Sequence, residues 1–492
     1  MKKILLICSI ALGLTATSCD SYLDINQDPN SPTEGNMTAG MILPAAEMNL
    51  SASYGYILRL TGGFYAQHYA HQYGVSNWLD ATRFMMSATR SSGTYTQLTS
   101  RCLNNLEVIR NLCVKNEDWG TYLAATTLRA FTYQVLVDCY GEVPYTEALD
   151  TNNPTPAYDE GSTVYNGILA ELDEALSKVS GNETVATSFL YPSSLANKWI
   201  QFANALKLRI LMRMSNVENV QAQLASLIAE DNFPTDDVCF ADCWADEAGK
   251  ANPFFWEELS TKSGTQKNVT LNIALLKTME DYGDARLGAF FSKNSSGAFT
   301  GGVSGTNFSL SSSYQAAYWS RPTGSYDSPV YLISVAETNF FLAEYEARYG
   351  SASKAEAYYK AAIEASFATA GVEGVDAVLA AYPWDTANYK EIIGIQKWIA
   401  LSGINSYEAW CELRRLGYPA FGSITGDDMT DEGDNFDTSI YEPGTLYTPI
   451  YYNASLGANK VLQRFPYAES SANRNENTPA YPGDASPVFW AK

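Results

Sequence analysis

Apolar side chains recur at helical spacing along most of this chain. The clearest stripe lies in residues 124–148 and consists of Ala124, Leu128, Phe131, Val135 and Leu136. Such a stripe is typical of a long helix whose inner face packs inside a helical stack. Gly141 interrupts the pattern and Pro144 stops it, so we expect the helix to end near Gly141.

The same period predicts helices elsewhere, over residues 39–50, 54–71, 96–114, 162–179, 193–214, 217–229, 271–282, 330–349, 354–367, 389–401 and 406–416. We expect the 96–114 helix to lie antiparallel to the 124–148 stretch, and Ser162 to cap the helix that follows it. In the 193–214 helix the expected buried side consists of Leu208, Ile210, Leu211 and Met212. Its expected wetter side carries Lys207, Arg209 and Arg213.

Residues 330–367 allow a test for an internal helical repeat. The tetratricopeptide pattern requires small and aromatic residues at fixed positions of a helix pair. The positions that fit are Leu342, Ala343, Ala355, Tyr359 and Ala362, whereas Glu346 replaces the usual aromatic residue. The sequence therefore predicts a mainly α fold of tetratricopeptide-like helix pairs, with long irregular loops and little β structure.

Residues 231–329 differ in character, because Gly, Ser, Asn and aromatic residues dominate there. Loop stretches at residues 73–83 and 314–326 combine aromatic rings with Asn, Gln and Arg. Sugar rings need a flat aromatic platform with polar groups at its edge, which makes both loops candidates for ligand binding. The residues assigned to that role are Tyr73, Asn77, Trp78, Arg83, Tyr314, Tyr318, Trp319 and Arg321. The alternative, that these rings cover the helical core, stays open.

The N-terminus has the pattern of a secreted, lipid-anchored protein. Lys2 and Lys3 precede an apolar run over residues 4–14, and small residues lead to Cys19. We expect a signal peptide at 1–18, lipidation of Cys19, a spacer at 19–38, and one α-helical domain at 39–492 with a loop-rich insertion at about 231–329. Ordinary cleavage near Ala16 is the alternative. No later stretch has eighteen uninterrupted apolar residues, so we expect no membrane span.

Composition narrows the functional classes. The formal net charge of −22 disfavours nucleic acid and anionic lipid as partners. Phosphate-cradling GxxxxGK[ST] and nucleophile GxSxG motifs are absent from the sequence. We therefore predict a protein that is not an enzyme.

Metal and disulfide chemistry has few candidates. The two histidines, His68 and His71, are spaced for one helical face, where a half-buried pair is a simpler interpretation than a metal site. The acidic stretch 427–437 could bind calcium, but it lacks the EF-hand spacing, and a solvated turn is the default. Disulfides between Cys239 and Cys243, or between Cys102 and Cys113, stay open. No other cofactor is expected.

Several ordered blocks resemble the SusD/RagB-type nutrient-binding lipoproteins. They are DINQDPN at 24–30, RAFTYQVLVDCYGEVPYTEAL at 129–149, FANALKLRILMRMS at 202–215, IQKWIAL at 395–401 and RFPYAES at 464–470. The resemblance implies a surface-exposed, lipid-anchored outer-membrane protein that works with a TonB-dependent transporter of the SusC type. It implies capture of oligosaccharides for import. Capture of peptides or amino acids, or a purely structural role beside the transporter, are the alternatives.

Overall fold

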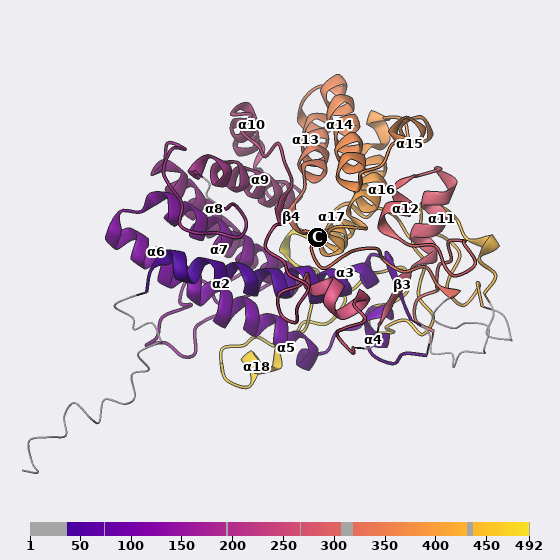
Figure 1. The fold of residues 1–492 in the computed structure, drawn as a ribbon, viewed down its shortest axis with the longest axis horizontal. Coiled ribbons are helices and arrows are strands. Elements are labelled where there is room, and N and C mark those ends of the chain that lie inside the picture. Colours follow the sequence, from indigo (N-terminus) through magenta and orange to yellow (C-terminus); the bar gives the residue numbers. More distant parts are fainter. Residues whose placement is uncertain are drawn as a thin grey trace, which may run out of the picture.

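The computed structural model describes residues 37–72, 74–192, 195–265, 267–306, 318–430 and 436–491. Its helices form two neighbouring groups, with irregular segments wrapped around them (Figure 1). One group contains α2 (Ala39–Ala52) and α6 (Asn104–Asn116) to α10 (Gln221–Ala229). The other runs from α13 (Val335–Tyr349) to α17 (Ser406–Leu416). The prediction of a mainly α fold is confirmed.

Helix α7 (Trp119–Tyr140) is the centre of the first group. Every residue from Gly120 to Tyr140 is buried, and the helix packs against α6, α8 (Gly161–Ser177) and α9 (Ala196–Met214). Gly141 ends it with a φ of 84°, and the side chain of Arg464 occupies the space that a Cβ of Gly141 would need. Only glycine satisfies both conditions. Because Gly141 lies in the 129–149 block and Arg464 in the 464–470 block, two of the blocks that resemble the SusD/RagB family meet at this turn.

The start of the first group departs from the expected boundaries. The helix predicted over 54–71 is a π-helical turn, η2 (Ser53–Leu58), then α3 (Arg59–Tyr65) and a strand, β1 (Tyr69–His71). The one predicted over 96–114 is part of a longer run of α5 (Ala88–Thr96), η3 (Gln97–Leu103) and α6. The expected cap at Ser162 is wrong, because α8 begins at Gly161 and its N-cap residue is Glu160.

The prediction of a solvent-exposed side of α9 is also wrong for two of its three residues. Leu208, Ile210, Leu211 and Met212 are buried as predicted, but Arg209 and Arg213 are fully buried as well. Arg209 donates to Glu337 at 2.7 and 2.9 Å, and Arg213 donates to Asp138 and Glu408. These carboxylates come from other helices, so the charges are neutralised inside the protein. Lys207 does reach the surface, where it pairs with Asp173.

The second group confirms the repeat. Helices α13 and α14 (Ala352–Ala370) pack side by side, and the positions that fit the repeat pattern, Leu342, Ala343, Ala355, Tyr359 and Ala362, are all buried. Glu346, the exception in the pattern, accepts a hydrogen bond from the main-chain N–H of Ser351 at 2.9 Å, where α14 begins. It therefore closes the turn between the two helices. Helices α15 (Val375–Ala381) and α16 (Tyr389–Leu401) complete the group before α17.

Residues 231–329 hold more regular structure than their composition suggested. They contain β2 (Val238–Phe240), a π-helical turn η4 (Phe255–Leu259), β3 (Val269–Leu271), α11 (Ile273–Asp281) and α12 (Arg286–Phe290). Strand β2 pairs antiparallel with β4 (Val330–Ile333), and β3 pairs antiparallel with β1. Short helices α4 (Leu79–Thr82) and α18 (Glu469–Ala472) lie in the surrounding loops.

The histidines do not share a helical face. His68 lies after α3, 3.0 Å from the Ser406 hydroxyl, and His71 ends β1 with Nε2 2.5 Å from the Val75 carbonyl. Burial lowers the pKa of His68 to about 3 and that of His71 to about 4. Both therefore pack as neutral side chains in the interior, and the expectation of a half-buried helical pair is wrong.

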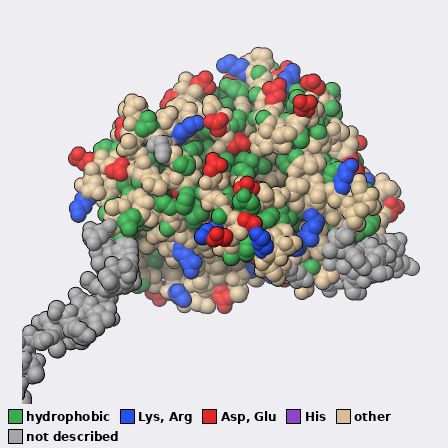
Figure 2. Space-filling model, in the orientation of Figure 1, with side chains coloured by type: hydrophobic (Ala, Val, Ile, Leu, Met, Phe, Trp, Pro, Cys, Tyr) green, Lys and Arg blue, Asp and Glu red, His purple; other side chains and the backbone are tan. Residues whose placement is uncertain are grey.

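The six cysteines of the described residues are free thiols, so neither open disulfide pairing is present. Among those residues, no helix combines the length and hydrophobicity needed to cross a bilayer. On the face shown in Figure 2, acidic and basic side chains are interspersed among apolar and neutral ones. The negative charge of the chain is thus not gathered into one patch on this face.

Candidate functional site

A small antiparallel sheet brings the two predicted loops together. Tyr69 and His71 of β1 pair with Leu271 and Val269 of β3, and the loop at 74–83 follows β1 directly. The main-chain N–H of Leu271 donates to the carbonyl of Ser320 at 2.8 Å, so the second loop lies along the same strand. Both candidate loops therefore extend from one short β scaffold.

A chain of polar contacts ties the loops to each other. Asn77 donates to Asn268 at 3.3 Å, and the Asn268 side-chain amide donates to Glu258 at 2.7 Å. The Asn268 main-chain N–H donates to the other Glu258 oxygen at 2.6 Å, and Arg321 Nη2 donates to the Glu258 carbonyl at 3.4 Å. Burial raises the pKa of the Glu258 carboxyl and lowers that of Arg321. Two of the predicted residues, Asn77 and Arg321, are thus joined through Asn268 and Glu258, which the sequence did not single out.

The two predicted tryptophans are buried rather than exposed to solvent. Trp78 is 5% exposed, and the guanidinium of Arg90 covers its ring at 4.1 Å from the centroid. Trp319 is 3% exposed and meets Tyr318 edge-to-face at 4.9 Å, whereas Tyr318 itself is 42% exposed. The tryptophans shape the loops, and Tyr318 presents the ring that a ligand can reach.

Arg83 connects the first loop to a segment that sequence reasoning missed. Its Nε donates to the Gly305 carbonyl at 2.8 Å, and its guanidinium lies 5.1 Å from the ring of Tyr451. Tyr451 is 60% exposed, and the neighbouring Ile450 N–H donates to Ser304 at 3.1 Å. The sequence feature that could have identified this segment is the aromatic and polar run at 451–453, which resembles the two loops in composition.

A cavity of about 150 Å³ lies beside the second loop. Phe299, Tyr318 and Trp319 line it with aromatic rings, while Lys277 and Glu280 of α11 supply charged groups to its lining. Aromatic faces with hydrogen-bonding groups beside them suit a polar ring with apolar C–H faces. Its volume is small, so it can hold only part of a larger ligand.

Several predicted residues lie outside the described residues, namely Cys19, Tyr73 and Tyr314, together with part of the acidic stretch at 427–437. Within the described ranges, no group of three or more His, Cys, Asp or Glu side chains could hold a metal ion. Calcium binding by the acidic stretch stays a prediction.

Comparison with known proteins identifies the family. Residues 29–438 match the family model SusD-like_2, described as "Starch-binding associating with outer membrane". The chain belongs to the SusD-like family. No curated protein matches this SusD-like chain.

Solved SusD-like structures share its fold. A SusD homologue from Bacteroides uniformis superposes with a TM-score of 0.74 at 21% identity, covering 92% of this chain and 99% of its own. A chitin-binding SusD homologue from Flavobacterium johnsoniae superposes with a TM-score of 0.73 at 20% identity, covering 92% and 98%. A SusD/RagB family protein from Bacteroides thetaiotaomicron gives a TM-score of 0.71 at 19% identity, covering 92% and 99%. The likeness extends over the whole of these relatives.

Proposed function

We propose that this SusD-like protein is a non-catalytic glycan-binding lipoprotein of the outer membrane, which captures oligosaccharides at the cell surface. Cys19 would carry the lipid anchor, and a TonB-dependent transporter of the SusC type would import the captured ligand. Family membership supports this role, as does the chitin-binding relative with the same fold.

One observation carries the proposal. The loops at 74–83 and 318–326 are bound to one β scaffold, and the exposed rings of Tyr318 and Tyr451 stand on segments joined to it. Rigid support lowers the entropic cost of binding, because the rings are held in place before the ligand arrives. Exposed tyrosines on supported loops are what a carbohydrate-binding face requires.

The test is a glycan array followed by calorimetry on the best ligand. The panel includes chitooligosaccharides and malto-oligosaccharides, because the family description names starch and one relative's description names chitin. We expect the pair Tyr318→Ala and Tyr451→Ala to weaken binding by about tenfold or more, at an unchanged melting temperature. Tyr358→Ala, at a half-buried tyrosine of α14, is the control.

Trp78→Ala with Trp319→Ala should lower both binding and stability, because these rings are buried. Unchanged affinity in the tyrosine pair would overturn the site. Binding of peptides but of no glycan would favour the peptide-capture alternative, and co-purification with the transporter without any ligand would favour the structural one.

A further inference from the structure

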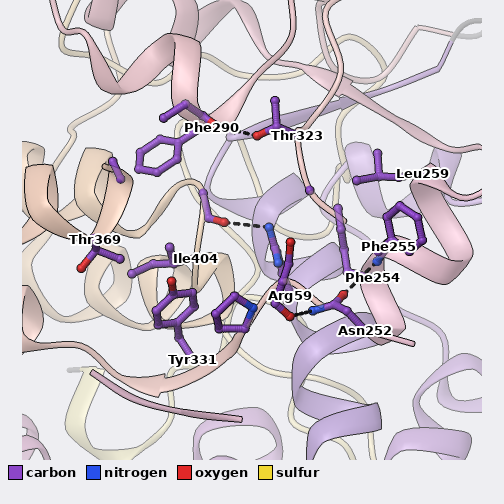
Figure 3. Close-up of a pocket in the computed structure, with 16 residues that line it drawn as sticks. Arg59, Asn252, Phe254, Phe255, Leu259, Phe290, Thr323, Tyr331, Thr369 and Ile404 are labelled. Atoms are coloured by element: carbon purple, nitrogen blue, oxygen red, sulfur yellow. Dashed lines mark hydrogen bonds between the residues drawn. The ribbon is translucent and has the colours of Figure 1, made fainter. Parts of the chain in front are cut away.

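A second cavity, of about 200 Å³, borders the scaffold of the candidate face (Figure 3). The turn η4 belongs to both, since Glu258 is part of the polar chain whereas Phe255 and Leu259 line the cavity. The second loop also runs into it, because Thr323 and Gly324 lie two and three residues after Arg321 and line its wall. The cavity therefore adjoins two of the segments that support the candidate face.

Arg59 is the charged residue in the lining of this cavity. Figure 3 shows its side chain surrounded by rings and aliphatic side chains, which belong to Phe254, Phe255, Leu259, Phe290, Tyr331 and Ile404. Arg59 is 8% exposed, and its guanidinium lies 4.2 Å from the centroid of the Phe254 ring. Aromatic walls around a cation suit a ligand that combines an apolar face with an anionic group.

The guanidinium of Arg59 has donors to spare. Nη2 donates to the Gly403 carbonyl at 2.8 Å, and Nε lies 3.4 Å from the Tyr69 hydroxyl. A guanidinium has five N–H groups, so these two contacts leave three. Arg59 forms no ion pair with any carboxylate of the described residues. Its positive charge is therefore stabilised by two neutral acceptors and by the face of the Phe254 ring, without a counter-charge.

Four buried arginines elsewhere follow a different rule. Each of them pairs with at least one carboxylate: Arg209 with Glu337, Arg213 with Asp138, Arg286 with Asp284, and Arg415 with Glu344. Pairing is expected, because a buried charge without a counter-charge is costly. Arg414 shows another solution, since its Nη1 donates to the carbonyls of Asp138 and Gln463, both at 2.8 Å. Arg59 differs from these five arginines by lining a cavity.

Three other polar side chains that line the cavity already make hydrogen bonds. Thr369 donates to Asp237 at 2.7 Å, and the Asn252 amide donates to the Ser328 carbonyl at 2.8 Å. The Thr323 hydroxyl donates to the Ala289 carbonyl. Asp237, the acidic group in contact with the wall, lies behind Thr369 and also accepts from the Val335 N–H at 2.7 Å. The guanidinium of Arg59 is thus the group best placed to recognise a ligand.

We propose that this cavity binds the carboxylate of an acidic sugar unit in the oligosaccharide that the neighbouring loops hold. The proposal rests on the proposed function and specifies its ligand as a glycan containing uronate or sialate. A planar carboxylate can accept two parallel hydrogen bonds from the free edge of the guanidinium. At roughly 30 Å³ per water molecule, the cavity holds about six or seven waters, which is the space of one sugar ring. Tyr331 and Phe290 offer ring faces to its C–H groups.

The test uses an array of uronate- and sialate-containing glycans beside their carboxyl-reduced forms, with calorimetry on the tightest binder. We expect at least one acidic glycan to bind about tenfold or more tightly than its reduced form, as charge-assisted hydrogen bonds require. Arg59→Gln should abolish that preference. Arg101→Gln, which removes an exposed arginine of η3, should keep it.

A second variant separates recognition from folding, because Arg59 also links α3 to the connection between α16 and α17. Ala370→Leu places bulk at the cavity wall and leaves Arg59 intact, so it should also remove the preference while the protein melts cooperatively. The proposal is overturned if no acidic glycan is preferred over its reduced form, or if both variants keep the preference.

Further arms separate this proposal from the proposed function. Peptides with a free C-terminus are compared with their amides, and an Arg59-dependent preference seen for peptides alone would overturn the sugar assignment. If neutral glycans bind through Tyr318 and Tyr451 without any acid preference, the acidic subsite fails and the glycan-binding function stands. If no glycan binds at all, the proposed function itself fails.

Discussion

At the scale of single residues, the most informative feature is the buried cluster around Asp138. This carboxylate accepts hydrogen bonds from the side chains of Gln134, Tyr165, Arg213 and Trp490. Its partners come from α7, α8, α9 and the C-terminal turn η9 (Phe489–Ala491). One side chain therefore links three successive helices to the C-terminal turn, and removing it would leave several buried donors without an acceptor.

The same cluster explains which residues carry the family resemblance. Gln134 and Asp138 belong to the block at 129–149, and Arg209 and Arg213 belong to the block at 202–215. Arg209 donates to Gln134 at 3.4 Å, so the two blocks meet in the core. The residues that identify the family are structural, whereas the candidate ligand contacts lie on the loops.

Glu47 provides a pH-dependent test at this scale. It is fully buried in α2 and accepts from the Ser188 hydroxyl and the Phe189 N–H, both at 2.6 Å. Burial nevertheless raises the pKa of its carboxyl from 4.5 to about 7. Between these values the folded state holds a proton that the unfolded state has lost, so stability falls as the pH rises through this window.

We expect Glu47→Gln to remove that decline. The shift corresponds to roughly 3 kcal/mol in the free energy of unfolding, fully lost above the folded-state pKa. Urea denaturation of both proteins at several pH values measures it, with Glu364→Gln on the exposed side of α14 as control. Parallel pH profiles for the wild type and Glu47→Gln would contradict the assignment.

At the scale of elements, hydrophobic periodicity predicted the position of most helices. It failed where tertiary packing determined whether an apolar segment became a helix or a strand. The ranges predicted for α16 and α17 coincide with the observed Tyr389–Leu401 and Ser406–Leu416. The helix predicted over 54–71 instead gives way to β1, because its apolar residues continue into a fully buried strand. Short buried strands and buried helices share a run of apolar residues, so the pattern cannot separate them.

The contact between α3 and α17 yields a second prediction. A Cβ added at Gly62 would lie 2.5 Å from the Tyr407 Cα and 2.7 Å from the Ser406 carbonyl, both of which are backbone. Gly62→Ala must therefore push the helices apart, which should cost about 1–3 kcal/mol of stability. Gly93→Ala is the control, since no atom beyond the backbone of its own helix α5 lies within 4 Å of the added methyl group.

Gly93→Ala should be neutral or stabilise the protein by about 0.5–1 kcal/mol, because alanine favours the helix. Chemical denaturation midpoints of the two variants measure the difference. Equal midpoints would show that α3 and α17 can separate without cost, and would refute the close contact.

At the scale of the whole molecule, the candidate face is assembled from distant parts of the chain. The loop at 74–83, Glu258 of η4, Asn268 before β3, and Arg321 meet in one hydrogen-bonded chain. Asn268 is the middle of that chain, since it donates to Glu258 and accepts from Asn77. The position of both loops therefore depends on a residue that is itself buried.

Asn268→Ala should loosen both loops at once. The variant loses the side-chain partner of Glu258 and of Asn77, which costs about 1–3 kcal/mol. Hydrogen exchange should quicken in residues 74–83 and 318–326 and stay unchanged in α7. Asn166→Ala, whose amide donates to the Ser162 carbonyl on the exposed side of α8, is the control. Faster exchange in only one loop would contradict a shared support.

Part of the candidate site is evident in the sequence of the two loops. Their composition indicated Asn77, Trp78, Tyr318 and Arg321, because aromatic and amide side chains outside helical patterns suit sugar binding. It did not indicate Asn268 or Tyr451, which become neighbours of those loops only through the pairing of β1 with β3 and through the course of the C-terminal segment. Single-residue chemistry is local, whereas the juxtaposition of loops is not.

The sequence by itself determined the helical repeat and the family, since side-chain periodicity and ordered motifs depend only on the order of residues along the chain. Tertiary structure alone decided the burial of Arg209 and Arg213, the cover of Arg90 over Trp78, and the cavity around Arg59. A charged side chain can be buried only where a partner from another element meets it, and a ring is exposed only where no neighbour covers it. Both conditions depend on contacts between distant segments, which no local pattern encodes.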